Sequence, residues 1–171
     1  PQDPNDEPAS VLLERIREEK ARLVEEKKIK KEKNPSVIFR GEDNSYYEKF
    51  TLSGEVKCID EEIPFEIPNG WEWCIIGNLF NHNNGKQLNR TNSSGELMSY
   101  ITTSNLYWSG FILNNLKKMP FEIKEIERCQ AIKGDLLVCE GGDIGRSCIW
   151  ENDEPIMLQN HIHKLRAYLP L

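Results

Sequence analysis

The chain has 171 residues, 38% hydrophobic and 29% charged, which suits one domain of ordinary size with a polar extension. No apolar run approaches the roughly 20 residues that span a bilayer, and no charged-then-apolar leader is recognisable, so a membrane protein is not expected. The net charge of −6 gives nucleic-acid binding no support, and five scattered cysteines without metal or disulfide spacing indicate a reducing, cytoplasmic environment.

The first predicted element is a charged helix over residues 11–33, a stretch without glycine or proline. Leu13, Ile16 and Leu23 recur on one face at helical spacing, and lysines occupy the other positions of that seam. A stripe this narrow leaves two interpretations open. The helix either covers its own domain, or it docks on a partner helix, which the thin stripe and lysine-rich end favour.

Asn34-Pro35 ends this helix, and residues 34–66 are predicted to form a polar connector with two aromatic spots. Residues 67–171 are predicted to form a mixed α+β domain with several short strands, so the fold class is α+β with a long charged helix in front. Within that domain we expect strands at 71–76 (or a strand leading into a helix near 77–79), 100–103, 107–113, 135–139 and 162–168, a loop at 81–95 and a short helix at 124–131.

The stretch from Gly134 to Arg166 is the most informative part of the chain. It alternates strands with a glycine-rich turn in which Gly141, Gly142 and Gly145 surround Arg146. Glycine is needed where φ is positive or where the backbone approaches a partner closely. The polar residues 159–163 then occupy the start of the last predicted strand.

Metal and catalytic sites are the alternatives to be weighed for this stretch. His161 and His163 are spaced to share one side of a strand, where His82 or Asp143 could join them, but a third and fourth ligand with clear spacing are lacking. Cys139 with a histidine, or Ser147 beside Arg146, lacks an evident oriented base, and no phosphate-loop or dinucleotide spacing occurs. We therefore predict no metal, no cofactor and no catalytic residue.

Nucleic-acid recognition fits the residue types better. Asn, Gln and Arg side chains read base edges, while Lys, Ser and Thr hold phosphates. Such residues are concentrated in the loops 83–94 and 102–108. The formal charge is −7 over residues 42–72 but +3 over 81–118, so a phosphate-facing surface can exist beside an acidic one.

Several strings, taken in order, resemble the target recognition domain of type I restriction–modification specificity subunits. They are Ile67-Pro68-Asn69-Gly70-Trp71-Glu72-Trp73, Tyr100-Ile101 with Asn105-Leu106, Gly134-Asp135-Leu136-Leu137 with Gly141–Gly145, and Leu158–Arg166. The leader from Val11 through Lys31 is similar to the helical spacer of those subunits.

The resemblance implies a bacterial or archaeal specificity-subunit fragment without catalysis. Such a subunit carries two recognition domains, each reading one half of a bipartite duplex DNA target, and directs methylation (M) and restriction (R) subunits. In this interpretation residues 1–33 are the spacer helix, 34–66 the connector and 67–171 one recognition domain. A protein-interaction scaffold without DNA binding of its own remains the alternative.

Loop position and chemistry give the residues expected to act. The expected DNA contacts are Lys86, Arg90, Thr102, Ser104, Asn105, Trp108, Arg146, Gln159 and His161, and the expected partner-helix contacts are Leu13, Ile16 and Leu23. Core packing remains the alternative for Trp108, and a solvent-facing strand position remains the alternative for Gln159 and His161.

Overall fold

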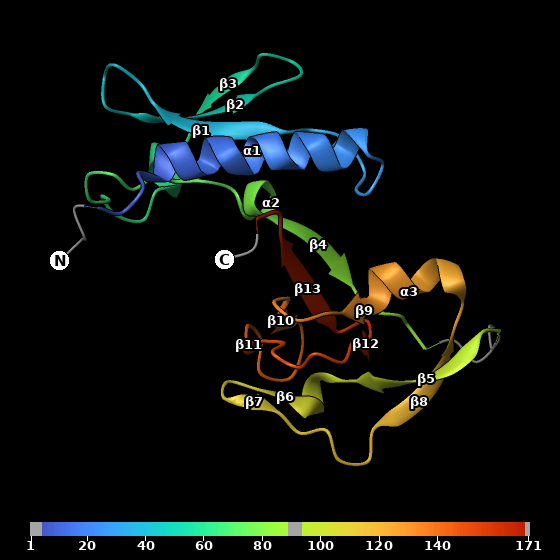
Figure 1. Cartoon of the computed structure of the whole chain (residues 1–171). Coiled ribbons are helices and arrows are strands. Elements are labelled where there is room, and N and C mark those ends of the chain that lie inside the picture. Colours follow the sequence, from blue (N-terminus) through green and yellow to red (C-terminus); the bar gives the residue numbers. More distant parts are fainter. Residues whose placement is uncertain (1–4, 89–93, 170–171) are drawn as a thin grey trace. The chain divides into compact units, whose positions relative to one another are not determined.

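The computed structural model describes residues 5–88 and 94–169 and shows a mixed α+β chain, as the sequence predicts. The chain divides into two compact units, residues 1–79 and 80–171 (Figure 1). The segmentation into 1–33, 34–66 and 67–171 concerns functional roles and stays a prediction. Among the described residues, no helix combines the length and apolarity needed to cross a membrane.

Unit 1 begins with α1 (Ala9–Glu25), which is shorter than the helix predicted over 11–33. The reason is a left-handed C-terminal turn, because Lys27 has a φ of 58°. The N–H groups of Lys28 and Ile29 both turn back to the Leu23 carbonyl, at 2.9 and 3.3 Å. These bonds satisfy orphan carbonyls at the helix end, so the lysine-rich residues beyond Glu25 leave the helix.

The rest of unit 1 contains a small antiparallel sheet in the order β1-β2-β3 (Ser36–Arg40, Tyr46–Phe50, Val56–Cys58). The segment expected to be a polar connector thus contains a three-stranded sheet. Phe39 and Tyr47, seen in the sequence only as aromatic spots, are cross-strand partners with stacked rings 5.6 Å apart. A 3₁₀ turn (Asp60–Glu62) follows, residues 71–75 form no strand, and α2 (Ile76–Leu79) matches the alternative helix start near 77–79.

Unit 2 contains two four-stranded sheets (Figure 1). The first has the order β11-β10-β13-β4 (Ser147–Ile149, Leu136–Cys139, Ile162–Ala167, Phe80–Asn84), with every pair antiparallel. The second has the order β8-β5-β12-β9 (Lys117–Phe121, Glu96–Ile101, Ile156–Leu158, Gln130–Ala131). A 3₁₀ turn (Thr103–Asn105), the hairpin β6–β7 (Leu106–Tyr107, Gly110–Phe111) and α3 (Ile123–Cys129) complete the unit.

Most elements expected in this part of the chain are present, with two exceptions. The strand expected at 107–113 is instead the hairpin β6–β7, because the chain turns at residues 108–109. The asparagine-rich stretch from residue 81 was predicted as a loop, yet Asn81, Asn83 and Asn84 lie in β4 and pair along β13. Asparagine is a poor strand former in isolation, but the ladder to β13 satisfies the backbone here and overrides that preference.

The core of unit 2 is apolar and lies where the two sheets meet. Ile101, Leu106, Leu137, Leu158 and Ile162 are completely buried in one cluster. A second cluster contains Tyr100, Met119, Phe121, Cys129 and Met157. β12 is parallel to β5, with Leu158 opposite Ile101, so the chain leaves both strands at the same edge.

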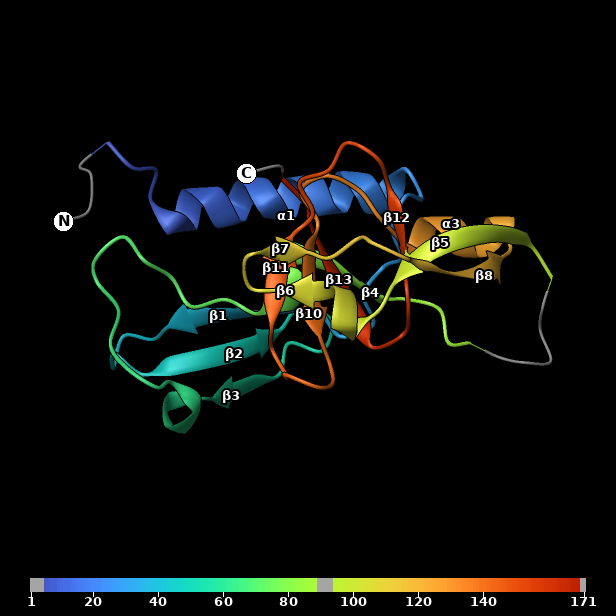
Figure 2. The ribbon, with the colours of Figure 1, turned by 90° about the horizontal axis from the view of Figure 1, so that it is seen from below.

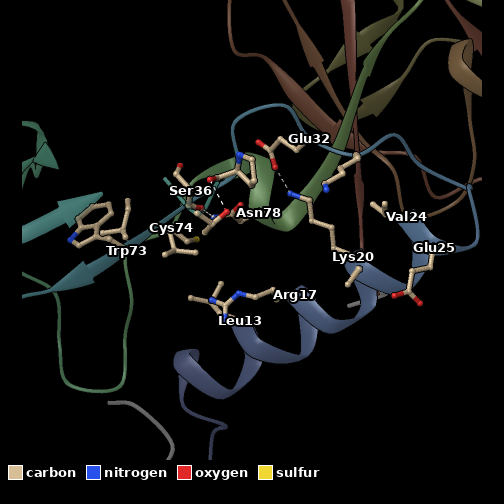
Figure 3. Close-up of a pocket in the computed structure, with 16 residues that line it drawn as sticks. Leu13, Arg17, Lys20, Val24, Glu25, Glu32, Ser36, Trp73, Cys74 and Asn78 are labelled. Atoms are coloured by element: carbon tan, nitrogen blue, oxygen red, sulfur yellow. Dashed lines mark hydrogen bonds and ion pairs between the residues drawn. The ribbon is translucent and has the colours of Figure 1, made fainter. Parts of the chain in front are cut away.

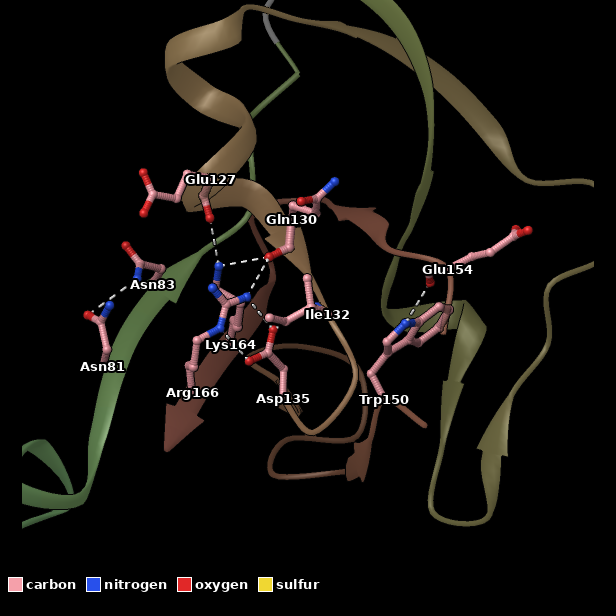
Figure 4. A network of polar contacts seen from close by, with 10 residues as sticks. All are labelled: Asn81, Asn83, Glu127, Gln130, Ile132, Asp135, Trp150, Glu154, Lys164 and Arg166. Carbon is pink, nitrogen blue, oxygen red and sulfur yellow. Dashed lines mark hydrogen bonds and ion pairs between the residues drawn. The ribbon is translucent and has the colours of Figure 1, made fainter. Parts of the chain in front are cut away.

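A buried polar network ties β13 to the chain around α3 and β10 (Figure 4). Arg166 makes a bidentate ion pair with Asp135, at 2.8 and 2.7 Å, and Asp135 is only 1% exposed. Lys164 is also buried and donates to the carbonyls of Glu127 and Gln130 at 3.0 and 2.8 Å. Pairing and hydrogen bonding compensate the cost of burying these charges.

Candidate nucleic-acid interface

Three loops of unit 2 meet at one edge, which we call the loop edge: residues 102–105, 140–146 and 159–161. The parallel pairing of β5 and β12 brings the first and third together, and Gln159 N–H donates to the Ile101 carbonyl at 3.0 Å. The second joins them because Glu140 N–H donates to the His161 carbonyl at 2.9 Å. Six of the nine expected DNA contacts lie on this edge: Thr102, Ser104, Asn105, Arg146, Gln159 and His161.

Arg146 links two of these loops. Its Nη2 donates to the Thr103 carbonyl at 2.7 Å, and its guanidinium carbon lies 5.1 Å from the centre of the Tyr107 ring. The Asp143 carboxylate is 3.8 Å away, and the side chain is only 16% exposed. Its Nε is buried without a hydrogen-bond partner among the described residues. Arg146 therefore positions the loops and offers only a small part of its surface to a ligand.

Glycine gives the 140–146 loop its shape. Gly142 and Gly145 have positive φ angles of 79° and 85°, which side-chain-bearing residues rarely adopt. Gly145 N–H donates to the Cys139 carbonyl at 3.0 Å, and Arg146 N–H donates to the Asp143 carbonyl at 3.1 Å. The turn thus closes on itself and turns the Arg146 side chain toward Thr103.

The 102–105 loop is held by its own side chains. Asn105 Oδ1 accepts from the Thr102 N–H and hydroxyl, both at 2.9 Å, and its Nδ2 donates to the Ile112 carbonyl at 2.9 Å. Thr102 also shares a 2.8 Å hydrogen bond with the exposed Ser104 hydroxyl. Asn105 is thus a structural cap, whereas Ser104 remains accessible.

Two of the three histidines, His161 and His163, lie near Glu140, and the third, His82, stacks on His163. His82 Nε2 lies 2.6 Å from His163 Nδ1, and the Glu140 carboxylate lies 3.4 Å from His163 and 3.8 Å from His161. Burial, then the neighbouring His163, lowers the pKa of His82. The residues described contain no group of three or more His, Cys, Asp or Glu side chains arranged to hold a metal ion.

Three expected contacts are buried, lie away from the loop edge or fall outside the described residues. Lys86 is only 5% exposed, because its ammonium bonds to the Pro120 carbonyl at 2.8 Å and to Glu125 at 2.6 Å. We therefore leave Lys86 out of the proposed contacts. Arg90 lies outside the described residues. Trp108 is 65% exposed at the β6–β7 turn, so it does not pack in the core.

Sequence reasoning missed two residues that shape this surface. Tyr107 supplies the ring beneath Arg146, and Glu140 is the carboxylate near two of the histidines. Tyr107 was visible as a neighbour of Trp108, but the pairing of residue 146 with residue 107 depends on the fold. No local pattern in the sequence indicated it.

The expected docking residues lie in unit 1. Ile16 is buried at 7% exposure, while Leu13 and Leu23 are half-buried. Leu13 lines a cavity of about 460 Å³ between α1 and β1, together with Val24, Trp73 and Cys74 (Figure 3). Lys20 closes one side through an ion pair with Glu32 at 2.7 Å. The helix therefore uses part of its apolar stripe within its own unit.

Comparison with known proteins places the chain among relatives of one kind. It is 49% identical over 85 residues to the type I restriction enzyme EcoAI specificity subunit of Escherichia coli, and 45% identical over 78 residues to the EcoEI specificity subunit of the same organism. The chain is related to type I restriction enzyme specificity subunits. The matched stretches cover 50% and 46% of this chain but only 11% and 10% of those relatives. No model of a known protein family matches the chain.

Proposed function

We propose that this chain reads duplex DNA as part of a type I specificity subunit and has no catalytic activity of its own. The observation that carries the proposal is the relationship to the EcoAI and EcoEI specificity subunits. The loop edge supports it, because side chains suited to hydrogen bonding with DNA gather there from three loops. The proposed site of action is the cytoplasm of a bacterial or archaeal cell, where the DNA is found.

The proposed contacts divide by exposure and chemistry. Ser104 and His161 are exposed, and Gln159 is half-buried, so these side chains can donate to or accept from base edges and phosphates. Arg146 holds the loops in place and adds positive charge. Thr102 and Asn105 maintain the shape of the first loop, and Arg90 and Trp108 stay in the proposed set on chemistry alone.

The proposed partners are the methylation and restriction subunits of such an enzyme. We propose that α1 belongs to the spacer region and takes part in assembly, with Leu13 and Leu23 supplying apolar surface that is still half-exposed. Ile16 is already buried within unit 1, so its substitution affects the unit before it affects a partner.

Methylation sequencing tests this function directly. A host with the intact gene is compared with one in which the gene is deleted, and with one carrying Ser104→Ala and Gln159→Ala together. Deletion should abolish one bipartite methylation motif, and the double variant should weaken or relax one half of it, since each lost base contact costs about 1–3 kcal/mol of discrimination.

A matched variant makes the result interpretable. Ser53→Ala changes an exposed serine in unit 1, outside the loop edge and the β6–β7 turn, and should leave the motif unchanged. If deletion removes no motif, the chain is not a specificity component. If the motif survives the double variant unaltered, the loop edge is not the reading surface, and an interaction scaffold becomes the better interpretation.

A further inference from the structure

An open groove of about 640 Å³ lies on unit 2 between the β6–β7 hairpin and β11. Its apolar lining comes from Trp108, Phe111, Leu113, Leu136, Cys148 and Ile149. β6 packs against β11, so the hairpin and this strand form neighbouring walls (Figures 1 and 2). The groove is separate from the residues proposed to read DNA, except for Trp108.

The groove has an ordered floor and rim. Phe111 packs edge-to-face on Trp150, with ring centres 4.9 Å apart, and Trp150 is 2% exposed. The Trp150 indole N–H donates to the Glu154 carbonyl at 3.0 Å. This bond fixes the loop 151–154 beside the groove, and Lys133 pairs with Asp153 of this loop at 2.7 Å.

The apolar walls remain open to solvent. Trp108 is 65% exposed, Ile149 is 49% exposed and Leu113 is 38% exposed. In the described part of the chain, the Trp108 side chain has no aromatic ring partner. A large aromatic side chain beside an apolar hollow is typical of the anchor region of a protein interface.

The charge of the rim decides what kind of partner fits. Glu151 lines the groove, and the exposed Asp153 and Glu154 follow it in the same loop. Among the described residues, Lys133 is the cation paired with this loop, through Asp153. Carboxylates in this position repel a phosphate backbone and attract lysine and arginine side chains. An apolar hollow beside them accommodates one large apolar side chain.

We propose that this groove docks a basic protein segment that inserts one apolar side chain against Trp108 and Ile149. The lysines or arginines that flank the anchor pair with the carboxylates of the 151–154 loop. This inference concerns a protein surface and does not rest on the DNA-reading function proposed for the loop edge, although both proposals include Trp108.

Two synthetic peptides test the inference on the whole chain. One is a nine-residue lysine peptide with a central leucine, and the matched peptide has a central serine. Binding is followed by NMR through the Trp108 indole and Ile149 methyl signals. The leucine peptide should shift both signals, and replacing leucine by serine should weaken binding at least about tenfold.

Chain variants complete the test. Trp108→Ala should weaken binding of the leucine peptide about as much as replacing the leucine by serine does. Glu151→Lys should weaken binding of both peptides. Ile123→Ala, at a residue 90% exposed on α3, should change nothing.

Three results would overturn the proposal. The first is equal affinity for the two peptides, or no binding at about 1 mM peptide. The second is shifts confined to another surface. The third is a Trp108→Ala variant that loses affinity for a duplex oligonucleotide but not for the peptide, which assigns the hairpin to DNA.

Discussion

Two lysines of unit 2, Lys86 and Lys164, are buried and bind backbone carbonyls around α3. Lys164 reaches the carbonyls of Glu127 and Gln130 at the C-terminal end of that helix, where a positive charge is favourable. Lys86 reaches the Pro120 carbonyl and Glu125, and this contact is the largest cause of the lowered pKa of Glu125. Both lysines therefore join α3 to distant strands, a role that residue type alone does not reveal.

The pKa of Lys164 is lowered to about 8; burial is the largest cause, the neighbouring Arg166 also lowers it, and Asp135 opposes the shift. Between about pH 8 and the ordinary value near 10.5, the unfolded chain binds more protons than the folded chain, so the free energy of unfolding rises with pH. Over that window the rise due to Lys164 is up to roughly 3 kcal/mol. Below pH 8 both states are protonated and its contribution is constant.

Urea unfolding of the wild type and Lys164→Met at several pH values between 7 and 10.5 measures this effect. The stability difference between the two proteins should move in favour of the wild type as pH rises, because methionine does not titrate. A difference that stays constant across this window would contradict the lowered pKa.

Arg146 is the other residue whose role can be resolved by substitution. If Arg146 positions the loops, Arg146→Lys should lower DNA affinity almost as much as Arg146→Ala. Lysine cannot reproduce the planar contacts with Tyr107 and the Thr103 carbonyl. We expect both variants to lower specific DNA affinity by about 1–3 kcal/mol. Fluorescence anisotropy with a duplex that carries the methylated motif measures this. Rescue by lysine would show instead that the charge itself contacts phosphate.

At the scale of elements, glycines at two positions near the loop edge have opposite constraints. A Cβ on Gly85 would overlap the backbone carbonyl oxygens of Leu158 and Gln159, whereas a Cβ on Gly141 would meet nothing within 4 Å, and Gly141 has no positive φ. The first position therefore depends on close backbone approach and the second does not.

We predict that Gly85→Ala destabilises the protein by about 2 kcal/mol or more, since the clash forces the 158–161 turn to move. Gly141→Ala should be tolerated within about 0.5 kcal/mol. Thermal unfolding of both variants tests the pair, and equal effects would contradict the close approach at Gly85. In addition, Gly85→Ala should lower DNA affinity, because the displaced turn carries Gln159 and His161.

Elements with a strong local pattern were predictable, and those that depend on distant pairing were not. The strand Leu136–Cys139 and the helix Ile123–Cys129 have apolar runs or helix-forming composition, and both are present. β4 was read as a loop because its asparagines are favourable only when paired with β13. The same holds for the site. Residue type was enough to select candidate loop residues, but it could not predict the burial of Lys86 or the contact of Arg146 with Tyr107.

At the scale of the whole molecule, the charge of −6 must be reconciled with the proposed DNA binding. The acidic excess is concentrated in residues 42–72, which belong to unit 1. At the loop edge, Arg146 is accompanied by Glu140 and Asp143, so hydrogen bonding rather than a large positive field has to provide most of the selectivity.

This charge distribution predicts that removing acid from the loop edge strengthens DNA binding. Glu140→Gln with Asp143→Asn removes two charges near the proposed duplex path and should improve affinity by roughly 0.5–1 kcal/mol per charge at low salt. Glu42→Gln with Glu61→Gln removes the same net charge from unit 1 and is the matched control. Anisotropy titrations at two salt concentrations distinguish local repulsion at the loop edge from an effect of net charge. A local repulsion is screened within about 10 Å at 0.1 M salt. If both double variants improve binding equally, the gain follows net charge alone, and the loop edge is not where the phosphates lie.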